Sequence, residues 1–278
     1  MSGYRSAVKG SFSRVWSVAK NTFTEAIRDR VLYSLFLFAA LMILSSLVIA
    51  SISAEQYGKI VKDIGLAAIS VIGIMISVFL GMGLVFKEID KRTVYNIFSK
   101  PVRRFEFILG KFFGLSFTLF VNTLAMAAVL TALVLLVETT HGGISRFYYG
   151  GSHYPQYFTA IYFEYLEFLV LVALAILFST FTTPVMTVLL CFLTFAAGRF
   201  ASDVRLFAEE VKAPLAKAVT QFVYVVLPHL DALDMRAEAV YGGHIGWRYA
   251  FLVTCYVALY TAALLFLSIV IFNKREFK

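Results

Sequence analysis

The chain has 278 residues, of which 60% are hydrophobic and only 15% are charged. Soluble domains average about 45–50% apolar and about 25% charged residues, so this composition excludes an ordinary soluble domain and predicts a polytopic membrane protein. The net charge of +8 is typical of basic cytoplasmic loops in such proteins, and no nucleic-acid partner is expected. Cys191 and Cys255 lie inside apolar runs, which favours core or lipid-facing side chains over a disulfide or a metal pair.

Residues 1–30 predict an amphipathic helix that lies in the membrane interface. Apolar residues recur there at helical spacing, and polar residues occupy the opposite face. We expect three of the apolar side chains to enter the acyl boundary, namely Trp16, Phe23 and Ile27. The alternative is an amphipathic helix packed on a soluble partner. The interface is favoured because an apolar span follows directly.

Six apolar segments then predict six transmembrane helices. They cover residues 31–53, 64–86, 107–137, 164–181, 184–200 and 248–272 approximately. A helix of about 20 apolar residues crosses a hydrocarbon core of about 30 Å. The first segment is too long for the apolar part of a signal peptide. The third is longer than crossing requires, so its start is expected in the interface or the cytoplasm. The fold class is therefore all-α, with a single transmembrane domain over residues 1–278.

The connecting segments differ in character. Residues 54–63 form a short polar link, and residues 138–163 are dense in aromatics, as in an interfacial aromatic belt. Between the fourth and fifth spans, Thr182-Thr183-Pro184 predicts a tight turn. Residues 201–247 are polar and contain an apolar run at 215–227. That run is too short to span, which predicts a re-entrant or interfacial helix.

The distribution of Lys and Arg predicts the orientation. Six spans place both termini on one side, where the N-terminal segment holds six of these residues, the central loop with its flank seven and the tail three, against nine on the opposite side. Because cytoplasmic loops carry the excess of positive charge, both termini and the loop at 87–106 are expected in the cytoplasm. The segment at 201–247 is then extracytoplasmic.

The predicted spans hold no acidic or basic residue in their apolar interiors, because Glu164, Glu167, Arg199 and Arg248 are assigned to span edges. Ionisable groups at depth mark proton relays and coupled-ion pathways, so their absence argues against a proton-driven transporter and an intramembrane protease. All four histidines fall in predicted outer loops, which argues against haem ligation. The chain also lacks a G-x-x-x-x-G-K-[ST] loop, so energy for vectorial work would enter from another polypeptide.

Two weaker polar constellations lie on the predicted outer side. Glu164 and Glu167 share a helix face and, with His153, could bind a cation or a basic substrate group. The alternative is a solvated helix start favoured by the helix dipole. His229, Asp231, Asp234 and His244 could ligate a metal, but their spacing matches no compact metal motif, and an ordinary loop is favoured. No metal site is therefore predicted.

The longest charged segment between apolar runs is Lys87–Lys111. Its pattern, Glu88 … Thr93 … Phe98-Ser99-Lys100-Pro101-Val102-Arg103-Arg104 … Leu109-Gly110-Lys111, resembles the first cytoplasmic loop of permease subunits of ATP-binding-cassette (ABC) transporters, in the type-2 exporter class. The resemblance covers the whole chain. It is closest to the group that includes the permease used in nitrous oxide reductase maturation. Arg92 departs from many members, which have glycine before the threonine.

The resemblance implies a short helix in this loop that docks into a groove on a cytoplasmic ABC ATPase. The docking residues would be Glu88, Asp90, Lys91, Arg92, Thr93, Tyr95, Ile97 and Phe98. Pro101, Arg103 and Arg104 would anchor the chain where it re-enters the membrane, beside anionic headgroups. The alternative is a basic loop that only sets topology, which does not account for the acidic residues and the apolar tip.

The resemblance also implies the partners. Two copies of the ATPase would bind ATP and Mg, so this chain would be no enzyme and would hold no cofactor. A second permease copy, the lipid bilayer and an extracytoplasmic accessory protein are the other expected partners, and the bacterial inner membrane is the expected location. The alternatives are a non-transporting membrane anchor and, less favoured, a polytopic transferase or protease. An uncharged lining fits hydrophobic cargo, or equally a path built by backbone and Ser/Thr groups.

Overall fold

The computed structural model describes residues 2–50, 57–90, 103–141, 154–201, 224, 226–241 and 245–274, and these residues form helices and no strand. In chain order the helices are α1 (Ser2–Ile27), α2 (Arg30–Ala50), α3 (Tyr57–Asp90), α5 (Arg104–His141), α7 (Tyr154–Ser179), α8 (Pro184–Arg199), the 3₁₀ turn η1 (Asp231–Leu233), α11 (Arg236–Tyr241) and α12 (Trp247–Lys274). The predicted all-α fold is confirmed.

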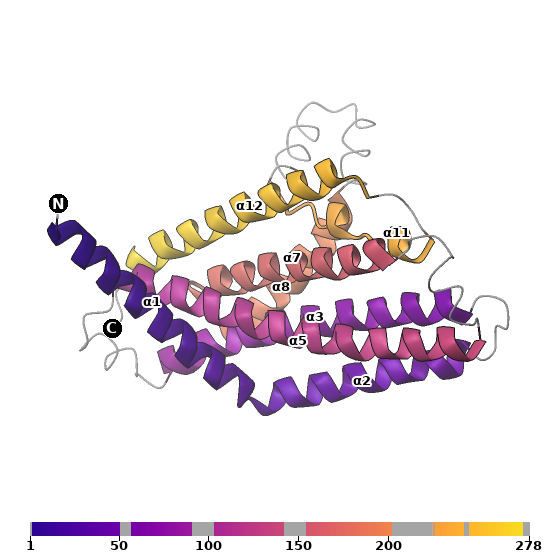
Figure 1. The fold of residues 1–278 in the computed structure, drawn as a ribbon. Coiled ribbons are helices and arrows are strands. Elements are labelled where there is room, and N and C mark those ends of the chain that lie inside the picture. The colour runs from indigo at the N-terminus through magenta and orange to yellow at the C-terminus, as the bar shows by residue number, and fades with distance from the viewer. Residues whose placement is uncertain are drawn as a thin grey trace, which may run out of the picture.

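Six helices run back and forth along one bundle (Figure 1). Of these, α2, α3, α5, α7 and α12 are long and apolar enough to cross a membrane, and α8 is a shorter apolar helix. The chain begins and ends at the same end of the bundle, as an even number of passes requires. We call this the terminal end and the opposite one the distal end.

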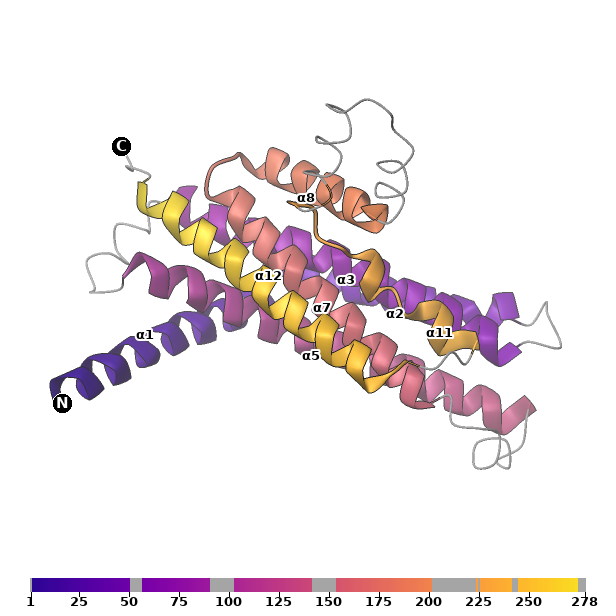
Figure 2. The same ribbon diagram turned by 90° about the horizontal axis from the view of Figure 1, so that it is seen from above.

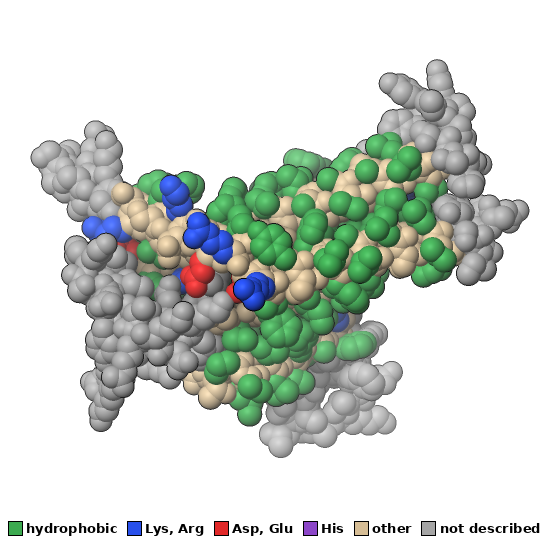
Figure 3. Space-filling model, turned by 90° about the horizontal axis from the view of Figure 1, so that it is seen from below, with side chains coloured by type: hydrophobic (Ala, Val, Ile, Leu, Met, Phe, Trp, Pro, Cys, Tyr) green, Lys and Arg blue, Asp and Glu red, His purple; other side chains and the backbone are tan. Residues whose placement is uncertain are grey.

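The two longest helices, α3 and α5, run between the distal end and the terminal end. α3 has 34 residues and α5 has 38, which correspond to about 50 and about 57 Å at 1.5 Å per residue. Both exceed the hydrocarbon thickness of about 30 Å. Charged side chains gather toward the terminal end on the face drawn in Figure 3, and apolar side chains cover most of the rest.

The most buried long helices are α3 and α7, which lie side by side in the core. Glycines of α3 allow this close approach. A Cβ atom at Gly73 would overlap the Phe168 ring, and one at Gly81 would lie 2.6 Å from the Ala175 methyl carbon. Gly83 faces open space instead, so its small size has no packing role among the described residues.

Helix α1 packs obliquely across the first half of α5 (Figure 2). A Cβ atom at Gly114 would lie 2.6 Å from the Ala19 carbonyl oxygen, and Thr22 and Ala26 are fully buried. The predicted amphipathic helix is therefore present, and its small residues contact α5. Trp16 is 65% exposed. Two further residues expected in the acyl boundary, Phe23 and Ile27, are half-buried.

Two helices begin earlier than the hydropathy predicted. α3 begins at Tyr57 rather than near 64, and α7 begins at Tyr154 rather than near 164. Residues 154–163 were therefore wrongly assigned to an aromatic loop. Tyr157, Ala160 and Phe163 are buried at helical spacing, which continues the core-facing stripe of α7. Polar and aromatic residues at the start of the helix masked this periodicity.

The predicted turn between the fourth and fifth spans is confirmed. Thr182 Oγ1 donates a hydrogen bond to the Phe178 carbonyl at 2.8 Å, and Pro184 occupies the first turn of α8. Proline suits this position because backbone N–H groups in the first turn have no acceptor inside the helix, so a residue without an N–H loses no hydrogen bond there.

Part of the predicted outer segment folds back onto the core. The Leu230 N–H donates to the Gly198 carbonyl at 3.2 Å, and Leu230 and Leu233 are buried. α11 then packs on α7 and α3. We call residues 226–241 the distal segment. The re-entrant helix predicted at 215–227 falls almost wholly on residues outside the described ones.

Candidate functional site at the junction of α1, α5 and α12

The start of α5 follows directly after the predicted docking loop, and one carboxylate organises it. Glu106 is fully buried. It accepts two hydrogen bonds at 2.8 Å from the Arg14 guanidinium, one at 2.6 Å from the Ser11 hydroxyl and one at 3.0 Å from the Arg103 backbone N–H. Bidentate pairs of this kind are among the stronger hydrogen bonds in proteins.

The sequence explains why Glu106 occupies this position. It is the third residue of α5, and its bond to the backbone N–H of Arg103 is half of a capping box. An acidic residue in the first turn also interacts favourably with the helix dipole. On the other side of the pair, the hydrogen bonds from Arg14 raise the pKa of that guanidinium above its ordinary value. Arg14 is therefore charged at any physiological pH.

A second contact joins α5 to the end of α12. Arg104 Nη1 donates hydrogen bonds to the Phe272 carbonyl at 2.9 Å and the Asn273 carbonyl at 3.0 Å. The last carbonyls of a helix lack partners inside the helix and carry partial negative charge, so a guanidinium is well suited to cap them. The rings of Phe107 and Phe272 stack beside this contact with centroids 6.0 Å apart.

A third contact lies two turns further along α5. Lys111 is only 1% exposed, and its Nζ lies 3.9 Å from Glu25 Oε2 on α1 and 5.7 Å from the centre of the Phe107 ring. Together, the contacts of Glu106, Arg104 and Lys111 bind α1, α5 and α12 into one unit at the terminal end. We call it the terminal junction.

The sequence-predicted docking residues are only partly described. α3 continues to Asp90, so Glu88 and Asp90 belong to its last turn and not to a separate helix. The remaining docking residues and Pro101 lie outside the described residues: Lys91, Arg92, Thr93, Tyr95, Ile97, Phe98 and Pro101. Of the predicted membrane anchors, Arg103 is exposed and Arg104 caps α12.

The predicted absence of ionisable residues inside the spans is wrong. Because α7 begins at Tyr154, Glu164 and Glu167 lie in its interior, and their exposed fractions are 2% and 0%. The interpretation of this pair as a solvated helix start is therefore overturned. His153, the proposed third member of that site, lies outside the described residues.

Charged partners from two other elements meet the pair on α7. Arg199, at the end of α8, contacts Glu167 at 2.9 Å and Asp234 at 2.6 Å. Arg236 of α11 binds both carboxylate oxygens of Asp234, at 2.9 and 2.8 Å. We call Glu164, Glu167, Arg199, Asp234 and Arg236 the distal charge cluster. It ties α7, α8 and the distal segment together.

Two members of the cluster lie outside the membrane-spanning helices. Burial would raise the pKa of Asp234, but the hydrogen bonds from Arg236 and the charges of Arg199 and Arg236 outweigh it and lower that pKa to about 2. The hydrogen bond to Asp234 raises the pKa of Arg236. Both groups are therefore ionised at neutral pH.

The other predicted outer ligands do not converge. His229 Nδ1 lies 3.1 Å from the Tyr256 hydroxyl, and Asp234 is engaged by arginines. Across the described part of the chain, no group of three or more His, Cys, Asp or Glu side chains could hold a metal ion. His244 lies outside that part.

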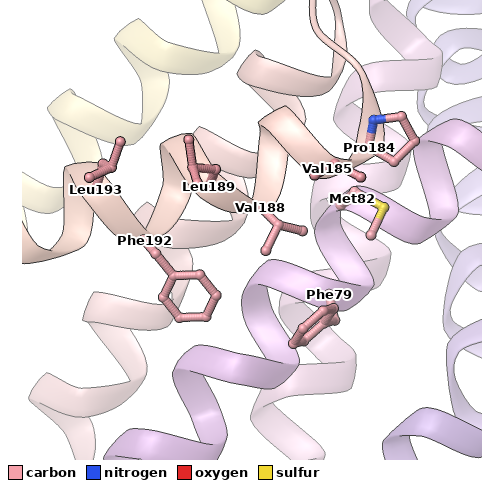
Figure 4. Close-up of a pocket in the computed structure, with 8 residues that line it drawn as sticks. All are labelled: Phe79, Met82, Pro184, Val185, Val188, Leu189, Phe192 and Leu193. Atoms are coloured by element: carbon pink, nitrogen blue, oxygen red, sulfur yellow. The ribbon is translucent and has the colours of Figure 1, made fainter.

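An apolar groove of about 550 Å³ lies between α3 and α8 (Figure 4). Its lining residues are Phe79, Met82, Pro184, Val185, Val188, Leu189, Phe192 and Leu193. Several of these side chains on α8 are more than half exposed, among them Val185 at 78% and Leu193 at 58%. This face of the bundle therefore offers a continuous apolar surface.

A model of the ABC-2 family of transporter proteins matches residues 16–277. The chain belongs to this family. As an ABC-2 protein it is a multi-pass membrane component of an ABC transporter, and the family implies partnership with an ABC ATPase. No curated protein matches the chain. The family match thus confirms the coarser part of the resemblance, and the nitrous-oxide-reductase-maturation group stays a prediction.

The residues of the terminal junction were largely missed by sequence analysis. Only Glu106 had a local sequence signal. It lies three residues after Arg103, which precedes α5, and this is the spacing of a capping box. Arg14 and Glu25 were assigned to the polar face of an interfacial helix. Their partners on α5 lie more than 80 residues away in the chain, and no local pattern predicts such a pairing.

Proposed function

We propose that this ABC-2 protein is an exporter-type permease that couples ATP hydrolysis by a separate cytoplasmic ATPase to substrate movement across the bacterial inner membrane. It would work as a homodimer with two ATPase copies, which bind the ATP and Mg. The observation that carries the proposal is the terminal junction. It binds the first turns of α5, directly after the predicted docking loop, to α1 and α12 through partly buried charged contacts.

The terminal end would face the cytoplasm. The excess of Lys and Arg in the two terminal segments and the central loop supports this orientation. The lengths of α3 and α5 suit it as well, because both helices would carry the loop between them beyond the headgroups toward the ATPase.

The proposed mechanism is a rigid-body transfer of motion. ATP binding would close the ATPase pair and displace the docked loop with the start of α5. Because Glu106 and Arg104 hold α5 to α1 and α12, these helices would move with it. Packed interfaces of this kind switch between discrete arrangements rather than deform continuously.

The substrate path would open between two copies of the permease. The apolar groove of α3 and α8 supports this placement, because a second copy would cover a surface that is otherwise exposed. Its lining suits a hydrophobic or lipid-like cargo. If the chain belongs to the nitrous-oxide-reductase-maturation group, as the resemblance implies, an extracytoplasmic accessory protein would bind on the distal side.

The docking loop can be tested by charge reversal. We expect Glu88→Lys combined with Arg92→Glu to release the ATPase from the purified complex, because the loop would supply the contact. Lys20→Glu reverses an exposed charge on α1 and serves as the control that keeps the ATPase bound. Retention of a fully active, bound ATPase by the loop variant would refute the docking role.

A further inference from the structure

The distal charge cluster contains one more negative than positive group. Arg199 and Arg236 supply two positive charges. Asp234 contacts both guanidinium groups, at 2.6 and 2.8 Å, and Glu167 contacts Arg199 at 2.9 Å. These four groups balance one another in charge and in close contacts. Glu164 is the carboxyl group left over.

Glu164 is also the least satisfied member. Its side chain is 2% exposed, both carboxylate oxygens are buried, and among the described residues the Ser70 hydroxyl of α3 is the one neutral hydrogen-bond donor that acts on it. Its nearest charged partner there is Arg236, whose Nε lies 3.8 Å from Oε1. That guanidinium donates two hydrogen bonds to Asp234, and its separation of 3.8 Å from Glu164 is an ion-pair distance too long for a hydrogen bond.

Within the part of the chain that the structure describes, no positive charge besides Arg199 and Arg236 acts on Glu164. α3 contributes the small polar residue Ser70, and the charged groups that act on Glu164 are Arg236, Arg199 and Asp234. Glu167, one turn away on α7, adds a second negative charge. An ionised carboxylate with no more than one neutral hydrogen-bond donor is costly to bury, and a nearby like charge adds to the cost. A neutral carboxyl group carries neither penalty.

We propose that Glu164 is a proton-binding site, occupied by a proton in this arrangement of the helices. The bound species is H⁺ on the carboxylate of Glu164, while Glu167, Asp234 and both arginines stay ionised. This assignment leaves the distal charge cluster electrically neutral. It does not depend on the ATPase or on the transported substrate.

Release of the proton is linked to the distal segment. Arg236 and Asp234 belong to that segment, which is attached through the bond of Leu230 to Gly198 and the contact of His229 with Tyr256. If Arg236 shifts to hydrogen-bond Glu164, or if water enters as the segment lifts, the ionised form gains partners and the proton passes to water. Movement of the distal segment and proton release are then reciprocally coupled.

Infrared spectroscopy of the full chain in lipid nanodiscs tests the proposal. A protonated carboxyl group gives a carbonyl stretching band that a carboxylate lacks. At pH 7 we expect this band in the wild type and its loss in Glu164→Gln. Asp63→Asn, which removes an exposed carboxylate of α3, is the matched control and should keep the band. If the band is lost in Glu167→Gln but not in Glu164→Gln, the proton is bound to Glu167, and the proposal is overturned.

The folding of the variant gives a second outcome. Glutamine is an uncharged analogue of the protonated side chain, so Glu164→Gln should fold and melt within a few degrees of the wild type at pH 7. Glu164→Lys, which would create a buried positive charge beside two arginines, should melt much lower. If Glu164→Gln fails to fold, or if the wild type has no protonated carboxyl band, Glu164 is ionised and the proposal is wrong.

Discussion

At the scale of single residues, this protein uses charged side chains to fasten its helices to one another. Arg104 closes the end of α12, Glu106 holds α1, and Asp234 joins α8 to the distal segment. Each of these groups has a partner distant in the chain or in another element. Arg104 was predicted to contact lipid headgroups, because a local pattern cannot show that two carbonyls at the C-terminal end of α12 lie within reach.

Arg104 should stabilise the folded bundle through this cap. We expect Arg104→Gln to lower the free energy of unfolding by about 1 kcal/mol, the usual size of a favourable charge at a helix C-terminus. Thermal unfolding in detergent measures the effect. Arg103→Gln removes the same charge from the exposed neighbour and should change stability by about 0.5 kcal/mol or less. Equal losses in the two variants would show that the cap contributes nothing.

Asp234 predicts a pH dependence with a definite sign. Its folded-state pKa is lowered to about 2, so its stabilising contribution is fully present above the unfolded pKa of about 3.9. The contribution is lost as the pH falls from about 4 toward 2. Wild type should therefore melt above Asp234→Asn at pH 7, and the two should converge only as the pH approaches about 2. A constant gap across this range would contradict the ion pairing.

At the scale of helices, apolar length predicted the number of apolar helices in the bundle but not where each helix begins. The six runs and the turn at Pro184 were found because both signals are local. The first ten residues of α7 were missed because aromatic residues and Glu164 lower the hydropathy, although Tyr157, Ala160 and Phe163 keep helical spacing. Because of this error, Glu164 and Glu167 were assigned to the edge of a span and not to the interior of α7. The distal charge cluster was therefore not predicted.

Helix packing in the core predicts a contrast between two glycines of α3. A Cβ atom at Gly73 would overlap the Phe168 ring, whereas Gly83 faces open space. Gly73→Ala should therefore destabilise the protein by about 1–3 kcal/mol, as overpacking typically does. Gly83→Ala should be neutral or stabilise by up to about 1 kcal/mol, because alanine is the better helix former. Unfolding of both variants in detergent measures the contrast, and a reversed order would contradict the packing of α3 on α7.

At the scale of the whole molecule, both ends of the chain lie at the terminal end of the bundle. That this end faces the cytoplasm is a prediction. A single cysteine at Asn96, in a background without Cys191 and Cys255, should react with a membrane-impermeant maleimide only in inverted vesicles. A cysteine replacing the exposed Trp247 at the distal end is the control and should react only from the opposite side. Labelling of residue 96 from outside would reverse the topology.

The family itself was predictable from the loop at 87–111 and the six spans together, because both are sequence features. What could not be predicted is how force would pass beyond the loop. The contacts of Arg14 with Glu106 and of Arg104 with α12 join segments separated by at least 92 residues. Such pairings depend on the fold, and they make the terminal junction the central element of the proposed mechanism.

The most direct test of that mechanism is the distance between spin labels on Leu193 of the two copies in the reconstituted complex, with and without a non-hydrolysable ATP analogue. Leu193 lines the groove and is exposed. We predict a nucleotide-dependent change of this distance in the wild type and in Lys20→Gln. In Glu106→Gln, which keeps the ATPase bound but loses the junction, the distance should stay fixed. An unchanged response in Glu106→Gln, or none in the wild type, would contradict transmission of motion through the terminal junction.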